Sequence, residues 1–241
     1  MKQLIYLIMF LCSASVYGQS LTIGILVTPP YAVYAGTDKQ YFGFTIDLMD
    51  NICRQIQAKC TYKPLQLNTE LDALQNGTVD LAFTPIPISN DSTGKFLFSL
   101  PYLISDGQFL ALTEASINKV TDLKDKHIGV ISLSLDQVLK KSRFNNGKIK
   151  LYATFPELIA GLNNHEVDAI FINNHVGQYI INNSMANVKL VGDKIPIGEG
   201  YGILGLKTNK ELIEQINSAL LKMEKDGSYL NVYNLYFGEK I

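Results

Sequence analysis

Side chains that could catalyse a reaction are scattered through this sequence. The three histidines, His127, His165 and His175, are not spaced as the ligands of a metal site and lie far from the cysteines. They form no Ser-His-Asp or Cys-His constellation. The Gly-x-Gly-x-Gly run at 198–202 leads into a β-prone segment rather than a helix, which argues against a phosphate site. We therefore expect no catalytic centre, no metal site and no cofactor.

Polar residues follow two segments that resemble each other. Residues 73–83 and 161–171 share the pattern Leu-x-x-x-x-Val-Asp-x-x-Phe, 88 positions apart, and each indicates a helix end, a tight turn and a buried strand. Chance similarity between two β-α-β units is the alternative. If the repeat is genuine, the chain folds as two similar lobes. Thr84 and Asn173 then face each other across a cleft, because ligands of open α/β sheets bind beyond the carboxyl ends of the strands.

Alternating elements surround these segments. Short apolar runs bounded by turns predict strands over 21–27, 61–67, 79–84, 108–113, 127–132, 149–153, 168–172, 188–191 and 202–207. Amphipathic patterns predict one helix after an N-cap at Thr45, one over 156–163 after Thr154, and one over 210–225 that stops at Gly227. This alternation indicates α/β layers with parallel strands.

The composition is that of a globular protein. Of the 241 residues 47% are hydrophobic, which suffices for one large domain or for two lobes. Lys and Arg number 21 against 22 for Asp and Glu, so the chain lacks the basic excess that nucleic acids or anionic membranes attract. We expect neither kind of partner.

The N-terminus has the features of a secretory signal peptide. Lys2 precedes an unbroken apolar run over 4–12, and Val16 and Gly18 occupy the −3 and −1 positions of a cleavage site. The run is shorter than the roughly 20 apolar residues of a spanning helix. Bulky residues before Cys12 argue against lipidation. We expect cleavage to remove residues 1–18 and leave a periplasmic protein.

Cys53 and Cys60 form an even pair in that oxidising compartment, where such pairs are more often bridged than free. Cys53 falls on a helical pattern, and Cys60 opens the next β-prone stretch. A disulfide would join the last turns of the helix to the following strand and contribute about 2–3 kcal/mol. A metal site is the weaker alternative, since the histidines are distant.

An ordered set of short motifs resembles the periplasmic solute-binding proteins of amino-acid ABC importers, solute-binding family 3, particularly the lysine/arginine/ornithine and histidine binders. The similarity covers nearly the whole mature chain, and the order of the motifs makes it specific. They are Leu21-Thr22-Ile23-Gly24, Pro29-Pro30-Tyr31, Gly43-Phe44-Thr45-Ile46-Asp47-Leu48, residues 74–80, Phe98-Ser99-x-Pro101-Tyr102, residues 122–130, Asp226-Gly227-Ser228-Tyr229 and Tyr236-Phe237-Gly238. The spacing of Cys53 and Cys60 also resembles the disulfide of the basic-amino-acid binders.

The resemblance implies a two-lobed periplasmic-binding-protein type II fold, in which each lobe is a mixed sheet flanked by helices and two hinge strands join the lobes. It places a discontinuous first lobe at 19–106 plus 200–241, and a second lobe at 107–199. Such a protein closes around a small polar solute and presents the closed form to a membrane ABC permease. We expect a monomer that binds its solute without converting it.

The resemblance also assigns candidate ligand-binding residues. They are Thr28, Tyr31, Leu67 and Thr84 in the first lobe, and Ser134, Leu135 and Asn173 in the second. Tyr31 and Leu67 would sandwich the apolar portion of the ligand, while Thr84 and Asn173 would supply hydrogen bonds. Ordinary core packing is the alternative for Tyr31 and Leu67, and capping is the alternative for Thr84 and Ser134.

Two departures from the family pattern concern charge. Family members that hold α-amino acids use an arginine for the carboxylate and an acid for the ammonium group, and here Ser92 and Asn173 occupy those positions. Serine cannot reproduce a bidentate guanidinium contact. We therefore expect a ligand that lacks a paired α-carboxylate and α-ammonium. Compensation by Lys95 or Asp91 from a shifted loop is the alternative.

Two other functions stay open. Periplasmic cyclohexadienyl dehydratases share this fold, although Asn173 and Asn174 cannot serve as the general acid that their chemistry requires. A soluble sensor for a membrane receptor has no sequence feature that separates it from a transport component.

Overall fold

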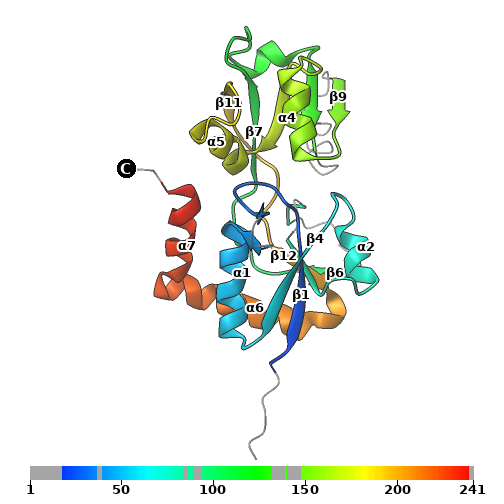
Figure 1. The fold of residues 1–241 in the computed structure, drawn as a ribbon, viewed down its shortest axis with the longest axis vertical. Coiled ribbons are helices and arrows are strands. Elements are labelled where there is room, and N and C mark those ends of the chain that lie inside the picture. The colour runs from blue at the N-terminus through cyan, green and yellow to red at the C-terminus, as the bar shows by residue number, and fades with distance from the viewer. Residues whose placement is uncertain are drawn as a thin grey trace, which may run out of the picture.

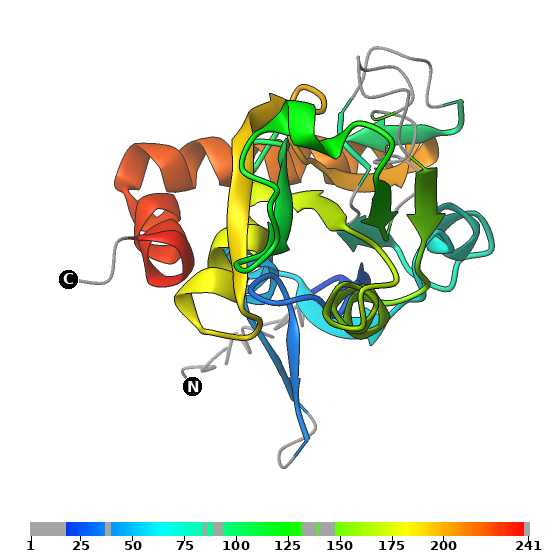
Figure 2. The same ribbon diagram turned by 90° about the horizontal axis from the view of Figure 1, so that it is seen from above.

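The computed structural model describes residues 18–36, 40–83, 86–88, 94–131, 139 and 148–238. Two five-stranded sheets form two lobes, which lie one above the other in Figure 1, and helices pack against both sheets. We call the unit built on the sheet that contains β1 lobe 1, and the other unit lobe 2. A separate two-stranded sheet, β2 (Val33–Ala35) with β3 (Gln40–Phe42), projects from the body of the molecule (Figure 2).

Lobe 1 is built on a sheet with the strand order β4-β1-β5-β12-β6. β1 (Ser20–Ile25) is parallel to β4 (Lys59–Pro64) and β5 (Leu81–Phe83), whereas β12 (Ile203–Leu206) is antiparallel to β5 and to β6 (Phe96–Phe98). Its helices are α1 (Phe44–Gln55), α2 (Glu70–Gln75), α6 (Lys210–Asp226) and α7 (Ser228–Phe237).

Lobe 2 is built on a sheet with the strand order β11-β7-β10-β8-β9. β8 (His127–Val130) is parallel to β9 (Lys148–Leu151) and β10 (Ala169–Asn173), whereas β7 (Asp106–Leu112) is antiparallel to β10 and to β11 (Val188–Pro196). Among the described residues, the helices that pack on this sheet include α4 (Phe155–Asn163) and α5 (Asn174–Asn182).

Both sheets are mixed, as the family resemblance implied: the parallel strands expected from the alternation are present, and antiparallel strands join them in each sheet. The chain passes directly from β6 in lobe 1 to β7 in lobe 2, and from β11 back to β12. Two consecutive strands of one sheet can be parallel only if a crossover connection joins them. β7 and β12 enter their sheets from the other lobe without such a crossover, so both are free to run antiparallel. β2, β3 and β6 are not among the strands predicted from the sequence: each has only three residues, and β2 and β3 lack the buried apolar run that marks the equally short β5.

The sequence repeat has the same local structure in the two lobes. Oδ2 of Asp80, just before β5, accepts a hydrogen bond of 2.7 Å from the backbone N–H of Thr22 on β1. Oδ2 of Asp168, just before β10, accepts one of 2.8 Å from the backbone N–H of His127 on β8. β5 and β10 are the middle strands of their sheets. Each aspartate therefore ties the start of a middle strand to its parallel neighbour.

Two of the predicted helix boundaries are confirmed. Oγ1 of Thr154 accepts a hydrogen bond of 3.3 Å from the backbone N–H of Glu157, as the N-cap of α4. Gly227 ends α6 in the left-handed conformation, with φ 80°. The apolar face predicted for this helix is buried and consists of Leu212, Ile213, Ile216, Leu220 and Met223.

Thr45 is not the N-cap of α1, which begins at Phe44 after Gly43. Gly43 has φ 135°, and a Cβ atom there would lie 2.4 Å from the carbonyl oxygen of Tyr31. Thr45 is buried within the first turn, and its Oγ1 donates a hydrogen bond of 2.8 Å to that same carbonyl. The sequence Gly-Phe-Thr therefore fixes the loop that carries Tyr31.

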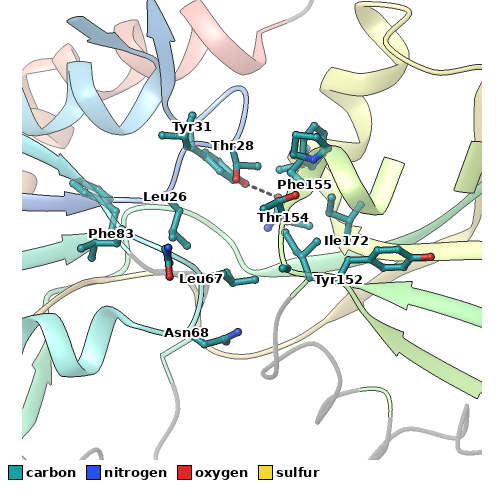
Figure 3. A pocket seen from close by; sticks show the side chains of 18 of the residues that line it. Leu26, Thr28, Tyr31, Leu67, Asn68, Phe83, Tyr152, Thr154, Phe155 and Ile172 are labelled. Atoms are coloured by element: carbon teal, nitrogen blue, oxygen red, sulfur yellow. Dashed lines mark hydrogen bonds between the residues drawn. The ribbon is translucent and has the colours of Figure 1, made fainter. Parts of the chain in front are cut away.

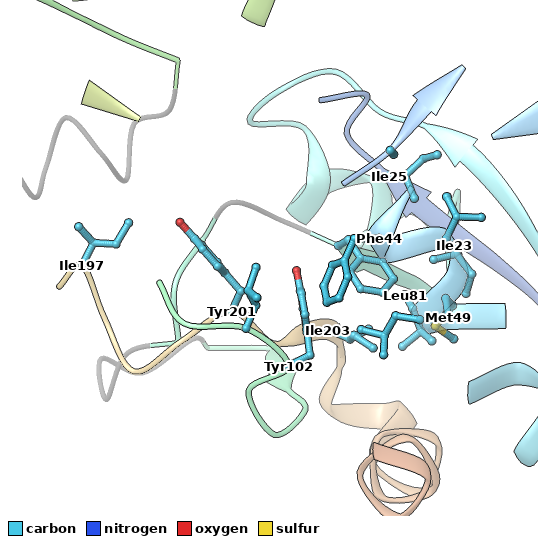
Figure 4. Packing of buried hydrophobic residues seen from close by; sticks show 14 of the residues in the cluster. Ile23, Ile25, Phe44, Met49, Leu81, Tyr102, Ile197, Tyr201 and Ile203 are labelled. Carbon is cyan, nitrogen blue, oxygen red and sulfur yellow. The ribbon is translucent and has the colours of Figure 1, made fainter. Parts of the chain in front are cut away.

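Lobe 1 packs its core between the sheet and its helices, with Ile23, Phe44, Met49 and Leu81 fully buried (Figure 4). The predicted disulfide is confirmed: Cys53 on α1 is bonded to Cys60 on β4, with a Cα–Cα distance of 6.2 Å. In the described part of the chain, no helix has the length and apolar character needed to cross a membrane.

Candidate binding cleft

A cavity of about 820 Å³ lies between the lobes (Figure 3). Lobe 1 lines it with residues that follow β1 and β4, among them Thr28 and Leu67. Lobe 2 lines it with Phe155, which follows β9, and with Asn173, the last residue of β10. These four strands are among the parallel members of their sheets, and their carboxyl ends open on the cavity. The cavity thus lies where the repeat in the sequence predicted a cleft.

A hydrogen bond crosses the cavity between Tyr31 and Asn173. The Tyr31 hydroxyl donates to Oδ1 of Asn173 over 2.5 Å, and the backbone N–H of His175 donates to the same oxygen over 2.9 Å. A backbone N–H requires an acceptor, so the side-chain oxygen of Asn173 must face His175 and its amide nitrogen must face away. The nitrogen, Nδ2, is buried and faces the Tyr201 hydroxyl without a well-formed hydrogen bond to any of the described residues.

Tyrosine hydroxyls surround this end of the cavity. Burial raises the pKa of Tyr201 to about 12, although the neighbouring amide of Asn173 acts in the opposite direction. Burial also raises the pKa of Tyr31 and of Tyr102, with further increases from the neighbouring phenols. These phenols are therefore neutral at physiological pH and act as hydrogen-bonding groups rather than as charges.

Four of the predicted ligand-binding residues line the cavity together: Thr28, Tyr31, Leu67 and Asn173. Tyr31 and Leu67 also pack against the hydrophobic cluster of lobe 2, so both take part in packing between the lobes. The other four predicted residues, Thr84, Ser92, Ser134 and Leu135, lie outside the described residues, as does Asp91. Lys95 is exposed next to β6 and does not line the cavity.

Sequence reasoning missed most of the lobe 2 wall. Leu151, Tyr152 and Phe155 line the cavity from the end of β9 and the start of α4. Tyr201, which precedes β12, was missed as well. The rule that places ligands beyond the carboxyl ends of strands would have pointed to Leu151 and Tyr152, because the predicted strand over 149–153 ends there.

A second contact between the lobes lies beside the cavity. The ring of His175, at the start of α5, packs against the ring of Phe237 on α7 at a tilt of 56°, with 4.6 Å between the ring centroids, and its Nε2 lies 3.5 Å from the Tyr233 hydroxyl. Burial lowers the pKa of His175 to about 4, with a smaller decrease from Lys194 and an opposing effect from Asp106. The ring is therefore neutral at physiological pH. No cluster of His, Cys, Asp and Glu in the described residues could hold a metal ion.

The sequence model of the family described as "Bacterial extracellular solute-binding proteins, family 3" matches residues 21–239. The chain is 27% identical to an arginine-binding periplasmic protein of Mannheimia haemolytica over 250 aligned positions, which cover 100% of both chains.

Solved structures agree with this match. The crystal structure of an arginine 3rd transport system periplasmic binding protein from Legionella pneumophila has 35% sequence identity and a TM-score of 0.84, and the match covers 91% of this chain and 100% of that one. An ancestral arginine-binding protein bound to arginine has 33% identity and a TM-score of 0.80, with 91% and 98% covered. The predicted two-lobed α/β fold is thereby confirmed, and the chain belongs to the bacterial extracellular solute-binding proteins of family 3.

Proposed function

We propose that this chain is a monomeric periplasmic receptor that captures a small amino-acid-related solute between its lobes and delivers it to a membrane ABC permease. The observation that carries the proposal is the cavity, which both lobes line at the carboxyl ends of their parallel strands. Binding without conversion agrees with the family, whose members are solute-binding proteins, and the dehydratase alternative has no support among the relatives.

Closure would occur about the two segments that connect the sheets, between β6 and β7 and between β11 and β12. We propose the division into 19–106 plus 200–241 and 107–199 for the moving units. The order of the strands supports it, since β12 returns to the lobe 1 sheet after β7 to β11 have built lobe 2. A ligand that contacts both units shifts the population toward the closed form.

Delivery to the periplasm requires the signal peptide. Residues 1–17 lie outside the described residues, and β1 begins at Ser20. The names of the arginine-binding and the lysine/arginine/ornithine-binding relatives place those proteins in the periplasm, which supports export of this chain. Mass spectrometry of the mature protein should find Gln19 as the first residue. A chain that retains residues 4–11, or carries a lipid on Cys12, would contradict this.

The relatives guide the choice of test solutes. Their names and titles include arginine, glutamine, cystine, and lysine/arginine/ornithine. We propose that Thr28, Tyr31, Leu67 and Asn173 contact the solute, and that Thr84, Ser92, Ser134 and Leu135 complete the site.

Thermal unfolding of the mature protein with each of these solutes, and with the small-molecule fraction of a periplasmic extract, tests solute binding. A ligand at 100 times its dissociation constant adds about 2.7 kcal/mol to the free energy of unfolding. An extract that causes no stabilisation, together with no response to any single solute, would contradict the proposed function. Uptake that persists when the gene is deleted would contradict the delivery step.

A further inference from the structure

The described walls of the cavity carry no charged side chain. Their polar residues are neutral: three threonines, the amides of Gln66, Asn68 and Asn173, and tyrosine hydroxyls. A guanidinium or ammonium group that entered this part of the cavity would lose its water without gaining a carboxylate.

Both lobes line the cavity with apolar side chains. Lobe 1 contributes Val27, Leu65 and Leu67, and lobe 2 contributes Leu151 and Phe155. Figure 3 shows Leu67 from lobe 1 opposite Phe155 and Ile172 from lobe 2. Val27 is 43% exposed and Leu151 is 47% exposed, so both offer apolar surface to a ligand in the cavity.

Tyr152 adds an aromatic ring without adding a polar group to the cavity. Its hydroxyl donates a hydrogen bond of 3.2 Å to Oε2 of Glu166, on the far side of the ring from Leu67 (Figure 3). Gly161 on α4 provides the space, since a Cβ atom there would lie 2.1 Å from that hydroxyl. The hydroxyl of Thr154 accepts the N-cap hydrogen bond of α4.

We propose that the solute carries an uncharged, largely apolar tail, which lies between Leu65 and Leu67 of lobe 1 and Leu151, Tyr152 and Phe155 of lobe 2. The proposal rests on the proposed function, because it names the solute class of the same cavity. It separates this chain from the arginine-binding relatives, whose names specify a solute with a cationic tail.

Matched solute pairs test the proposal independently of the head group. Norleucine and lysine share an α-amino-acid head, and caproamide and ε-aminocaproamide share a neutral amide head. In each pair only the second solute has a terminal ammonium. Calorimetry should show that the uncharged member of at least one pair binds about tenfold tighter, or better, than its charged partner. Absence of this preference in both pairs, tighter binding of the charged member in either pair, or no binding of any of the four overturns the proposal.

Failure of the proposed function gives a different result. If the periplasmic extract stabilises the protein but none of the four solutes binds, solute capture stands and the apolar tail is wrong. If the extract also has no effect, both are wrong.

A variant that places a charge in the apolar wall of the cavity tests the proposed location of the tail. Leu151→Glu should reverse the preference within the pair that binds, because the new carboxylate gives the ammonium a partner. Leu151 is already partly exposed, so the variant should fold. Leu221→Glu is the matched control, since Leu221 is 54% exposed on α6 and does not line the cavity. Retention of the natural preference in Leu151→Glu, with normal folding shown by circular dichroism, overturns the proposed location of the tail.

Discussion

The hydroxyl of Tyr31 donates a hydrogen bond of 2.5 Å to the side-chain oxygen of Asn173, a residue 142 positions away in the other lobe. Tyr31 is held by the loop that Gly43 and Thr45 fix, and Asn173 is held as the last residue of β10 and the N-cap of α5. The bond therefore connects two segments that other hydrogen bonds hold in place. It occupies the oxygen of Asn173, so among the described residues the amide nitrogen is the atom of this side chain that remains for a solute.

Tyr31→Phe removes this bond and retains the ring that packs against Phe237 and the lobe 2 cluster. The Asn173 oxygen keeps the N–H of His175. A hydrogen bond between neutral groups contributes about 1 kcal/mol, so closure should weaken and solute affinity should fall about fivefold. Calorimetry with the best solute from the panel measures this. Tyr34→Phe on the projecting β2 is the control, and equal affinity in both variants would show that the bond does not assist closure.

Asn173→Asp keeps both acceptor contacts and replaces a buried N–H group by a carboxylate oxygen. The described cavity offers this charge no cationic partner, so the free energy of unfolding should decrease by a few kcal/mol. Binding of a solute with an ammonium group should improve, and Ser92→Arg added to the same protein should improve binding of an α-amino acid further. Asn231→Asp, exposed on α7, is the control for stability. No change in stability would mean that water or residues outside the described ones reach the carboxylate.

Features of the structure that depend on residues close together in the chain were predicted correctly from the sequence. Thr154 and Gly227 work as caps because a hydroxyl acceptor and a left-handed glycine act within a few residues of themselves. The repeated pattern around Asp80 and Asp168 also predicted a turn before each strand, although the hydrogen bonds of these aspartates to the parallel strands join residues far apart in the chain.

Features decided by distant contacts could not be predicted in the same way. Threonine is a common N-cap residue, but the hydroxyl of Thr45 donates a hydrogen bond to the carbonyl oxygen of Tyr31 instead. That contact forms only when the loop that carries Tyr31 is folded. The lobe 2 wall was missed because Tyr152 and Phe155 have the pattern of ordinary core residues. They become cavity residues only where the second lobe faces the first.

Loss of the Cys53–Cys60 disulfide should lower stability and leave solute binding intact, because the bridge joins α1 to β4 and neither cysteine lines the cavity. The chain-entropy effect is about 2–3 kcal/mol. Cys53→Ser should lose more than Cys60→Ser, since Cys53 is only 4% exposed and would place a hydroxyl in the core. Urea denaturation and calorimetry measure the two effects. Two titratable thiols in the native protein would contradict the bridge.

His175 should make the protein less stable in mild acid. Its pKa is about 4 in the folded protein, against an ordinary value of 6.5, so the unfolded chain takes up a proton in this interval and the folded protein does not. Above pH 6.5 both states are neutral at this residue and the contribution is zero. As the pH falls from 6.5 to 4, it should grow to a loss on the order of 3 kcal/mol.

His175→Phe isolates this contribution. The phenyl ring keeps the contact with Phe237 and cannot be protonated, so the difference in the free energy of unfolding between variant and natural protein should increase steadily from pH 7 to pH 4. The groups that act on His175, Lys194 and Asp106, are retained in both proteins and cancel in this difference. His165→Asn, on an exposed turn with φ 57°, is the control for the loss of a histidine. A difference that stays constant with pH would mean that His175 is protonated in the folded protein as easily as in the unfolded chain, and that its ring is not enclosed between α5 and α7.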